Sequence, residues 1–388
     1  MDQRQKFIAA FILGEQSVSA LARQFGVSRK TANKWLARFR AGGFRALDPR
    51  SSRPHQPANE LSEPVRAAIL AARDAHPSWG PKKLRAHLAD HPALAIIPAA
   101  SSIGRVLKSA GKIDSRRRTA KAYATPTSLT PPTSPNHVWT VDFKGWFVTT
   151  DGVKCYPLTI MDSHSRYLLA CVALTETSGA TVRPTFEWLF TTSGLPAIIR
   201  SDNGPPFASP GLNGFTALNV WWRRLGIRLE RIAPGHPEQN GRHERLHRTL
   251  KAEVLIAADC AAQQRLFDAF LPYYNTQRPH EALRQRPPAS LYTRSPRSAP
   301  ATLPALSYPA QALVRVVRDN GTIRCWGKEL YLTTALTGEA VALLPNANGQ
   351  WWVVFAQELL GWCTEHEVVL RGKQGQTDRL LLGPAVTF

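Results

Sequence analysis

Residues 137–174 read HVWTVDFKGWFVTTDGVKCYPLTIMDSHSRYLLACVAL, a stretch rich in β-branched and aromatic side chains. Such residues favour strands, and polar pairs such as Asp151-Gly152 favour turns. The composition predicts three successive strands, Val138 to Val148, Val153 to Met161 and Arg166 to Leu174. Shorter strands at Ala197 to Ser201 and Gly226 to Ile232 then alternate with helices. We therefore expect a mixed α/β sheet flanked by helices over residues 137–295.

The chain before this sheet is predicted to be helical. Apolar residues recur at helical spacing over residues 3–13, Ser19 to Phe25 and Ser28 to Gly42, which is the rhythm of a helix-turn-helix domain over residues 1–47. Near the start of the third helix, where base edges would be contacted, lie Arg29, Lys30 and Asn33. The residues expected to pack inward are Ala32, Trp35 and Leu36. A basic three-helix bundle that binds no DNA is the alternative.

A second helical region is predicted over residues 62–113, after a Pro/Ser/Arg-rich linker at 48–61. Helical periodicity covers Ser62 to Ala75, a basic segment opened by Trp79-Gly80-Pro81, and Ala99 to Leu107. The region suits either a second DNA-binding fold or a spacer bundle. In the first case its phosphate contacts would be Lys82, Lys83 and Arg85. A basic, Pro-rich linker follows at 114–136.

The C-terminal part is expected to be a separate small domain. A Pro/Ser-rich linker at 296–310 precedes residues 311–388, which are rich in Val, Leu and Trp and carry turn signals at Asn320-Gly321 and Asn348-Gly349. These features predict a small β-barrel. Either DNA binding or the pairing of subunits would suit such a domain.

The charge of the chain points to a polyanionic partner. At 388 residues, two to four domains are expected, and the formal net charge is +21. Residues 1–136 hold 23 Lys and Arg against 8 Asp and Glu, a surplus of 23 − 8 = 15. Nucleic acid is therefore a better partner than a membrane. The longest apolar run near the start, Phe7 to Leu13, is too short to span a bilayer.

The five cysteines are widely spaced, without a C-x-x-C pair. An odd number in this arrangement argues against a disulfide framework and against a Cys-based zinc site. A reducing cytoplasm fits this cysteine usage.

Three carboxylates stand out against this basic background. Asp142 lies within an apolar strand, where a charge is costly unless it meets a cation or lines a cleft. Asp202 directly follows a short strand, at the kind of sheet edge where α/β folds place their sites, although an Asp-Asn-Gly sequence is by itself a common turn. Glu244 lies on a helix predicted to begin after Pro237.

The helix that carries Glu244 is predicted to be two-sided. At about 100° per residue, one face collects Asn240, Glu244, His247, Arg248 and Lys251, whereas Leu246 and Leu250 lie on the other and can pack on the sheet. Such a face is either solvated or lies against DNA. In the second case Arg248 and Lys251 would contact phosphates.

The strings that carry these carboxylates are WTVD at 139–142, SDNGPPF at 201–207 and PGHPEQNGRHERLHRTLK at 234–251, and YNTQRPHEAL follows at 274–283. Together they resemble bacterial insertion-sequence transposases built on the retroviral-integrase catalytic core, over residues 137–292. The resemblance implies an RNase H-like core in which Asp142, Asp202 and Glu244 are the catalytic carboxylates and hold Mg²⁺ or Mn²⁺. Double-stranded DNA, as element ends and target, would be the substrate, and a homo-oligomer would join two ends.

Two other carboxylates compete for places in this trio. The family typically has 35 residues between its second Asp and its Glu, which selects Glu238 (238 − 202 − 1 = 35), whereas Glu244 is further along (244 − 202 − 1 = 41). The family pattern N-G-x-x-E selects Glu244, and the extra residues are then placed in the loop around Ser209 to Gly214. Asp162 is predicted to cap a polar turn instead of binding metal.

Hard carboxylate oxygens suit Mg²⁺, and two ions sharing Asp142 would suit phosphodiester hydrolysis followed by strand transfer. The fourth string is expected to be structural packing near the site, with Arg278 as a possible DNA contact, and Trp221-Trp222 is expected to be core or interface. The main alternative is a non-catalytic DNA-binding regulator of transposition. A nuclease without strand transfer is a second alternative, and a tyrosine recombinase is poorly supported.

Overall fold

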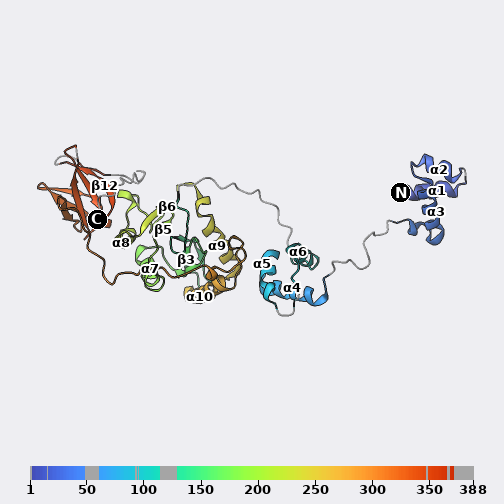
Figure 1. Ribbon diagram of the computed structural model, residues 1–388, viewed down its shortest axis with the longest axis horizontal. Helices are drawn as coiled ribbons and strands as arrows, with labels where there is room; N and C mark the ends of the chain where they lie inside the picture. The colour runs from blue at the N-terminus through green and yellow to red at the C-terminus, as the bar shows by residue number, and fades with distance from the viewer. Residues whose placement is uncertain are drawn as a thin grey trace. The chain divides into compact units, whose positions relative to one another are not determined.

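The computed structural model describes residues 2–14, 16–48, 61–91, 94, 96–113, 129–346, 348–364 and 368–370. The chain divides into two compact units, residues 1–62 and residues 63–388, and each is described by itself (Figure 1). Most of the predicted linker at 48–61, residues 114–128 of the next linker and the end of the chain lie outside the described residues.

The first unit is a small helical domain, as predicted. Its helices are α1 (Gln3–Ile12), α2 (Val18–Gln24), α3 (Arg29–Gly42) and the 3₁₀ turn η1 (Phe44–Leu47). Ser28 caps α3, because its side chain accepts a hydrogen bond from the Thr31 N–H. Ala32 and Leu36 are buried, and Trp35 packs edge-on against the buried ring of Phe7. The predicted inward face of α3 is therefore confirmed.

The second unit begins with the second predicted helical region, α4 (Glu63–Ala75), α5 (Pro81–His87), η2 (Leu88–Asp90) and α6 (Ala100–Ser109). These helices contact the sheet domain through the segment between α4 and α5. Trp79 is fully buried, stacks on His76 with ring centroids 3.8 Å apart, and lies 6.3 Å from the ring of Tyr273 in the sheet domain. Ser78 donates to Glu253, which also pairs with Arg278.

The central sheet is mixed, as predicted. Its strands are β1 (Val138–Phe143), β2 (Phe147–Val148), β3 (Lys154–Asp162), β4 (Leu168–Leu174), β5 (Ile198–Ser201) and β6 (Arg228–Arg231). The order is β2-β3-β1-β5-β6, with β4 also paired to β3. β1 is antiparallel to β3 and parallel to β5. The single strand predicted over Val138 to Val148 is instead divided, because Gly145 adopts φ 91° between β1 and β2.

Helices cover both faces of this sheet. On one face, α7 (Gly179–Ser193) and α8 (Ala217–Arg224) bury Phe186 and Trp222 against Trp139 of β1. On the other, α9 (Gly241–Glu253) and α10 (Cys260–Thr276) bury Leu246 and Phe267 against β3 and β4. The core reading of Trp222 is confirmed. The short turns η3 (Leu212–Gly214), η4 (Pro237–Asn240), η5 (Glu281–Leu283) and η6 (Pro288–Ser290) connect these elements.

The C-terminal region forms two sheets. Its elements are β7 (Leu313–Val316), β8 (Thr322–Cys325), β9 (Lys328–Tyr331), η7 (Thr334–Leu336), β10 (Ala340–Pro345), β11 (Trp351–Phe355), β12 (Glu358–Cys363) and β13 (Val368–Leu370). One sheet runs β13-β12-β11-β10-β7, and β8 pairs with β9. The described residues show no pairing that closes these sheets into a barrel, so closure stays a prediction. The Asn320-Gly321 turn forms, but it joins β7 and β8, which belong to different sheets.

The C-terminal sheets pack on the loop to which the extra residues were assigned. Leu212 and Phe215, together with Val220 of α8, share one apolar core with the buried residues of β10 and β11. Two ion pairs border this core, Arg223 with Glu358 and Arg224 with Glu339. The longer spacing between the second Asp and the Glu thus coincides with a contact surface for the C-terminal region.

No helix in the described part of the chain is long and apolar enough to cross a membrane.

Candidate active site

The strand register brings Asp142 and Asp202 to the same sheet edge. β1 and β5 are parallel, with Val138 opposite Ile198 and Thr140 opposite Arg200. Partners in this register differ by 60 in residue number (198 − 138 = 60). Two residues further along, the same register sets Asp142 beside Asp202, which directly follows β5. Alternation along β1 turns Trp139 towards α7 and α8, so Asp142 faces α9. Asp202 accepts a hydrogen bond from the Gly204 N–H (3.2 Å), as an Asp at a turn commonly does.

Glu244 lies in the first turn of α9, with an exposed side chain. The helix begins at Gly241, two residues later than the predicted Gln239, so Asn240 precedes it. The Asn240 side-chain amide donates to Asp142 Oδ2 at 2.7 Å. The N-terminal end of α9 is thereby tied to the carboxylate of β1, on the side of the sheet where Glu244 projects.

The charges of Asp202 and Glu244 both act on the pKa of Asp142. Burial raises the pKa of Asp142 from 3.8 to about 7, the Asp202 carboxylate adds to the rise, and Glu244 contributes a smaller part. The hydrogen bond from Asn240 acts in the opposite direction. A cation at this place would lower the free-energy cost of ionising Asp142, because it would neutralise the negative charge of the neighbouring carboxylates.

The carboxylates form an open arrangement. Among the described residues, no group of three or more His, Cys, Asp or Glu side chains could hold a metal ion by itself. Mg²⁺ keeps several of its waters and binds through one or two carboxylates together with substrate phosphates. The oxygen donors present therefore fit an ion shared with a phosphodiester better than a closed protein cage.

A buried polar network holds α9 against β1 and β3. Thr159 of β3 lies at its centre, and its Oγ1 is 3.1 Å from the Asp142 main-chain oxygen, 2.6 Å from His243 Nε2 and 2.8 Å from His247 Nε2. The hydroxyl has one proton, which it donates to the Asp142 oxygen. Both imidazoles therefore share this hydroxyl. His243 Nδ1 lies 3.0 Å from Thr140 Oγ1, which itself donates to the Met161 main-chain oxygen at 3.3 Å, and a neutral His243 ring carries its one N–H at only one of its two contacts.

Burial supports this neutral form of His243. The side chain is fully buried, and burial lowers its pKa well below 6.5, with the neighbouring His247 adding to the effect. Burial likewise lowers the pKa of His247 to about 4. His247 therefore faces the sheet, not the solvent face of α9 on which it was predicted to contact DNA.

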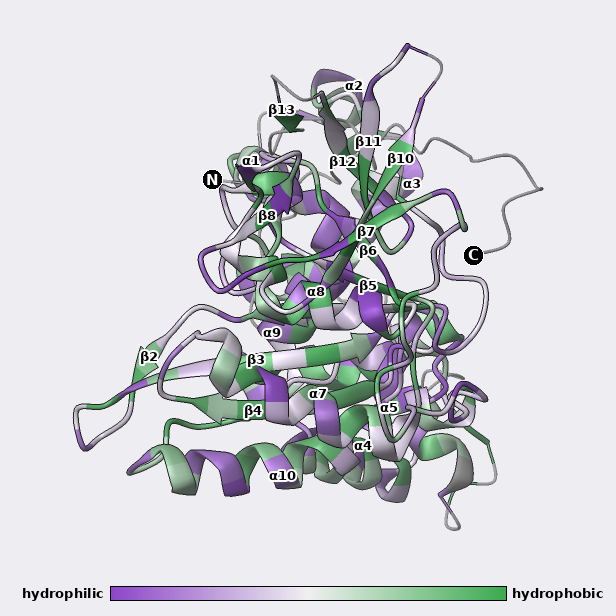
Figure 2. Cartoon of the chain, turned by 90° about the vertical axis from the view of Figure 1, so that its left-hand side faces the viewer, coloured by the Kyte–Doolittle hydropathy of each residue, from purple (hydrophilic) through white to green (hydrophobic). Residues whose placement is uncertain are grey.

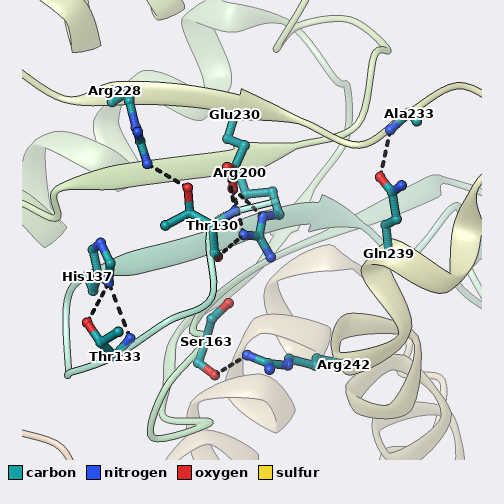
Figure 3. Close-up of polar contacts among 10 residues, drawn as sticks. All are labelled: Thr130, Thr133, His137, Ser163, Arg200, Arg228, Glu230, Ala233, Gln239 and Arg242. Atoms are coloured by element: carbon teal, nitrogen blue, oxygen red, sulfur yellow. Dashed lines mark hydrogen bonds and ion pairs between the residues drawn. The ribbon is translucent and has the colours of Figure 1, made fainter. Parts of the chain in front are cut away.

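The entry to α9 is fixed by further contacts (Figure 3). Arg242 donates to the Ser163 main-chain oxygen at 2.9 Å, and Gln239 accepts from the Ala233 N–H at 2.8 Å. Across β5 and β6, Arg200 pairs with Glu230 (2.6 Å) and donates to the main-chain oxygen of Thr130. The helix bearing Glu244 is thus anchored at its start and along its buried face.

The structure separates the two competing carboxylates from the trio. Glu238 lies in η4, where it contacts His236 (2.8 Å), and it is not among the charges that raise the pKa of Asp142. Asp162 is buried and accepts hydrogen bonds from the Asn136 and Ser165 N–H groups at 2.8 and 2.7 Å. The turn-capping prediction for Asp162 is confirmed.

The predicted DNA contacts fall into two groups. Exposed side chains are found at Arg29, Lys30, Asn33, Arg85, Arg248 and Lys251. The others are engaged within the protein: Asn240 and His247 as described, Lys82 in an ion pair with Glu281, and Arg278 with Glu253. Burial lowers the pKa of Lys83 to about 8, with Arg278 adding to the effect. Arg278 is only 6% exposed, which favours its structural reading over a DNA contact.

Sequence reasoning missed Thr159, His243 and Lys144. Thr159 and His243 carry no local signal, because a Thr in a strand and a His on a helix are ordinary; only the packing of α9 on β3 joins them. Lys144 follows Asp142 by two residues, but it lies in the break after β1, which the prediction treated as continuous strand.

The stability of the metal-free protein should depend on the ionisation of Asp142. Its pKa is higher in the folded chain, so between about pH 4 and pH 7 folding takes up a proton, and that stabilisation is lost as the pH rises through the window. Asp142→Asn, which has no charge to lose, should melt above wild type at pH 8 in a chelating buffer. The difference in melting temperature between Asp142→Asn and wild type should decrease as the pH falls from 7 to 4. Thermal melts across this range test it, and a pH-independent gap would contradict it.

Thr159→Val is expected to destabilise the second unit. It leaves the Nε2 atoms of His243 and His247 without their hydroxyl partner, at a cost of about 1–3 kcal/mol for each group that stays buried and unsatisfied. Thr159→Ser keeps the hydroxyl and serves as the control. Denaturant unfolding measures both variants, and equal losses would show that the methyl group, not the network, is responsible.

Family comparisons agree with these observations. The integrase core domain family matches residues 132–237, and a second integrase core family matches residues 225–288. A helix-turn-helix domain family matches residues 3–55, and a homeodomain-like family matches residues 31–107.

Relatives occur in bacterial insertion elements and in retroviruses. An uncharacterised 31.7 kDa protein of insertion element IS407 from Burkholderia multivorans is 29% identical over 53% of this chain and 73% of its own length. An uncharacterised 39.2 kDa protein of IS476 from Xanthomonas euvesicatoria is 28% identical over 46% of this chain and 50% of its own length. The Gag-Pol polyprotein of baboon endogenous virus is 27% identical over 53% of this chain but only 12% of the polyprotein.

Solved structures with some likeness include the HTLV-2 integrase catalytic core domain in complex with magnesium. It has 16% identity and a TM-score of 0.32 over 42% of this chain and 100% of that one. The simian T-cell lymphotropic virus intasome has 15% identity and a TM-score of 0.36 over 75% and 97%.

Proposed function

We propose that this chain is a member of the integrase-core family of transposases and integrases, and that it binds the ends of an insertion element and catalyses both their cleavage and their joining to target DNA. One observation carries the proposal. Asp142, Asp202 and Glu244 converge from a strand, a strand end and a helix, and their mutual repulsion helps to hold the pKa of Asp142 near 7. Such crowding is typical of functional sites.

The metal is proposed to be Mg²⁺, or Mn²⁺, bound as two ions. Asp142 would bind both, with Asp202 completing one shell and Glu244 the other. When bound, the ions supply activation of the attacking oxygen and charge stabilisation for the leaving oxygen. Carboxylate oxygen is the donor that these hard cations prefer.

The residues of the chain position the DNA and the carboxylates. Asn240 orients Asp142 through its hydrogen bond, and the Thr159 network keeps α9 seated. Arg248 and Lys251 lie one and two turns beyond Glu244 and are exposed, which suits contacts with phosphates beside the scissile bond.

The reaction is proposed to proceed in two displacements at phosphorus. In the first, water attacks the phosphate at the element end, the 3′ oxygen leaves with a proton, and a free 3′-OH results. In the second, that 3′-OH attacks a phosphate of the target, and a target 3′ oxygen leaves. Since both steps are direct, no covalent bond between protein and DNA is needed, and no Ser or Tyr nucleophile is assigned.

End recognition is proposed to lie in the N-terminal helices. Arg29, Lys30 and Asn33 are exposed at the start of α3, as base contacts require. Arg85 of α5 is also exposed and suits a phosphate contact. Bringing two ends together would take at least two copies of the chain.

The test is a DNA cleavage and joining assay with the full chain. Inverted repeats flanking the gene supply the end sequence, and labelled duplexes carrying it are incubated with Mg²⁺ or with a chelator. Nicked and joined products that require the metal are expected. Tight end binding without any product would favour the regulator, and nicking without joining would favour a simple nuclease.

A further inference from the structure

An exposed aromatic side chain follows Asp142 by four positions along the chain. Trp146, in the break between β1 and β2, is 57% exposed. The ammonium group of Lys154 lies 4.7 Å from the centre of its ring. Two apolar neighbours on the same ribbon, Val148 and Val153, are 42% and 41% exposed. A solvent-facing indole beside a cation is the combination with which proteins stack bases and hold phosphates.

Unbalanced positive charge connects this tryptophan to the site. Lys144 lies between Asp142 and Trp146 in sequence, and its ammonium group lies 5.3 Å from the centre of the Phe147 ring at the start of β2. Lys251 is exposed on α9, one turn beyond His247, which contacts Thr159 of β3. Among the described residues, none of Lys144, Lys154 and Lys251 has an ion-pair partner. Lysine side chains that have no ion-pair partner are available to a polyanion.

The ribbon that carries Trp146 is held in place. Thr149 N–H donates to the Val153 main-chain oxygen at 2.9 Å, and Thr149 Oγ1 donates to Asp151 at 2.6 Å. The tip is tied to the segment after α9, because the Thr150 and Asp151 N–H groups donate to the oxygens of residues 257 and 258 at 3.2 and 3.0 Å. Figure 2 shows β2 extending from one end of the sheet. The indole is therefore presented on a fixed support.

We propose that Lys144, Trp146, Lys154 and Lys251 form a binding site for an unpaired DNA strand that runs away from the carboxylates. The inference rests on the proposed function and names the part of the DNA that the site receives. Lys144 and Lys251 would bind phosphates, and the Trp146 ring would stack on a base, which is possible only where that base is unpaired. The charge of the ribbon favours DNA over a second copy of the chain.

The length of the chain between the site and the ring sets the reach. Trp146 follows Asp142 by four positions (146 − 142 = 4), and extended chain covers at most roughly 13 Å over that span. A stacked strand rises about 3.4 Å per nucleotide. The contacted base therefore lies within about four nucleotides of the scissile phosphate.

Binding of the full chain to two matched DNAs tests the site. Both are labelled duplexes of the element end, one blunt and one with an overhang of about five unpaired nucleotides, measured by fluorescence anisotropy without divalent cations. Trp146→Ala should weaken overhang binding between about fivefold and 150-fold, the range for loss of one stacked base, and should change blunt binding little. Trp146→Phe should keep most of the wild-type affinity for the overhang DNA, because an aromatic ring remains to stack on the base.

Two further variants sharpen the test. Trp188→Ala is the matched control, since Trp188 is 56% exposed but lies on α7, which covers the opposite face of the sheet from α9. It should bind both DNAs as wild type does. Lys144→Gln should lower the slope of log affinity against log salt by about 0.7–1, as expected for one lost phosphate contact.

The outcomes separate this inference from the proposed function. If wild type nicks and joins but Trp146→Ala binds the overhang as tightly as wild type, or weakens both DNAs equally, the binding site is wrong and the enzyme stands. If Trp146→Ala shifts the mass in sedimentation without changing overhang binding, the patch joins two copies instead. If Trp146→Ala weakens binding of the overhang DNA as expected, but wild type yields no product with Mg²⁺, the strand-binding site stands and the catalytic proposal falls.

Discussion

Asp142→Asn and Glu244→Gln are each expected to abolish nicking and strand transfer together, while the full chain still binds element-end DNA. Both substitutions keep the side-chain volume and remove the negative charge that would hold a hard cation. Because one set of carboxylates is proposed to serve both displacements, the two activities should fall in parallel. Asp202→Asn should behave in the same way. Product formation from labelled end DNA, with anisotropy for binding, measures both quantities.

Glu238→Gln is the matched control for this result. Glu238 lies 35 residues after Asp202 but contacts His236 in η4, so its loss should leave both activities near wild type. If activity survived in Glu244→Gln and disappeared in Glu238→Gln, the third ligand would be Glu238 and the assignment to Glu244 would be wrong. Activity that survived in Asp142→Asn would overturn the catalytic proposal itself.

Arg278→Ala is expected to cost about 3–5 kcal/mol of the free energy of unfolding of the second unit, as removal of one partner from a buried ion pair typically does. The side chains of Arg278 and Glu253 are only 7% and 10% exposed, and Glu253 also accepts from Ser78, which precedes the buried Trp79. The variant leaves the Glu253 carboxylate buried without its cation. Denaturant unfolding followed by fluorescence measures the loss.

Lys82→Gln is the control at the same contact between the helical region and the sheet domain. Its pair with Glu281 is exposed (67% and 61%), so its loss should cost less than about 1 kcal/mol. Equal stability of Arg278→Ala and wild type would contradict the structural role of Arg278. The double variant Arg278→Met, Glu253→Leu removes both charges and should recover most of the stability. If that variant then bound DNA poorly, Arg278 would be a DNA contact after all.

Local patterns in the sequence were sufficient for the elements. Runs of β-branched and aromatic residues predicted the central strands, helical periods predicted the first domain, and the inward face of α3 followed from spacing alone. Motif strings selected Glu244 over Glu238, and the charges that raise the pKa of Asp142 are those of Asp202 and Glu244. These features depend on neighbours within a few residues, or on a pattern that a family preserves.

Partners distant in sequence were decided by the tertiary structure. Periodicity placed Asn240 and His247 on one solvent face of α9, but the helix starts at Gly241, so Asn240 turns to Asp142 and His247 turns to Thr159. The break at Gly145 after β1, which the prediction of one continuous strand did not include, leaves Trp146 exposed to solvent.

The sequence by itself therefore predicted the nature of the elements and selected the three carboxylates, because hydrophobic period and motif spacing are properties of the local chain. Only the tertiary structure decided which polar side chains contact Asp142 and the helix beside it, and which polar side chains are exposed. Arg278, 76 residues beyond Asp202 (278 − 202 = 76), could be recognised as an internal ion-pair partner only once Glu253 and Ser78 were seen beside it. Burial and pairing are set by contacts across the fold, which no local period encodes.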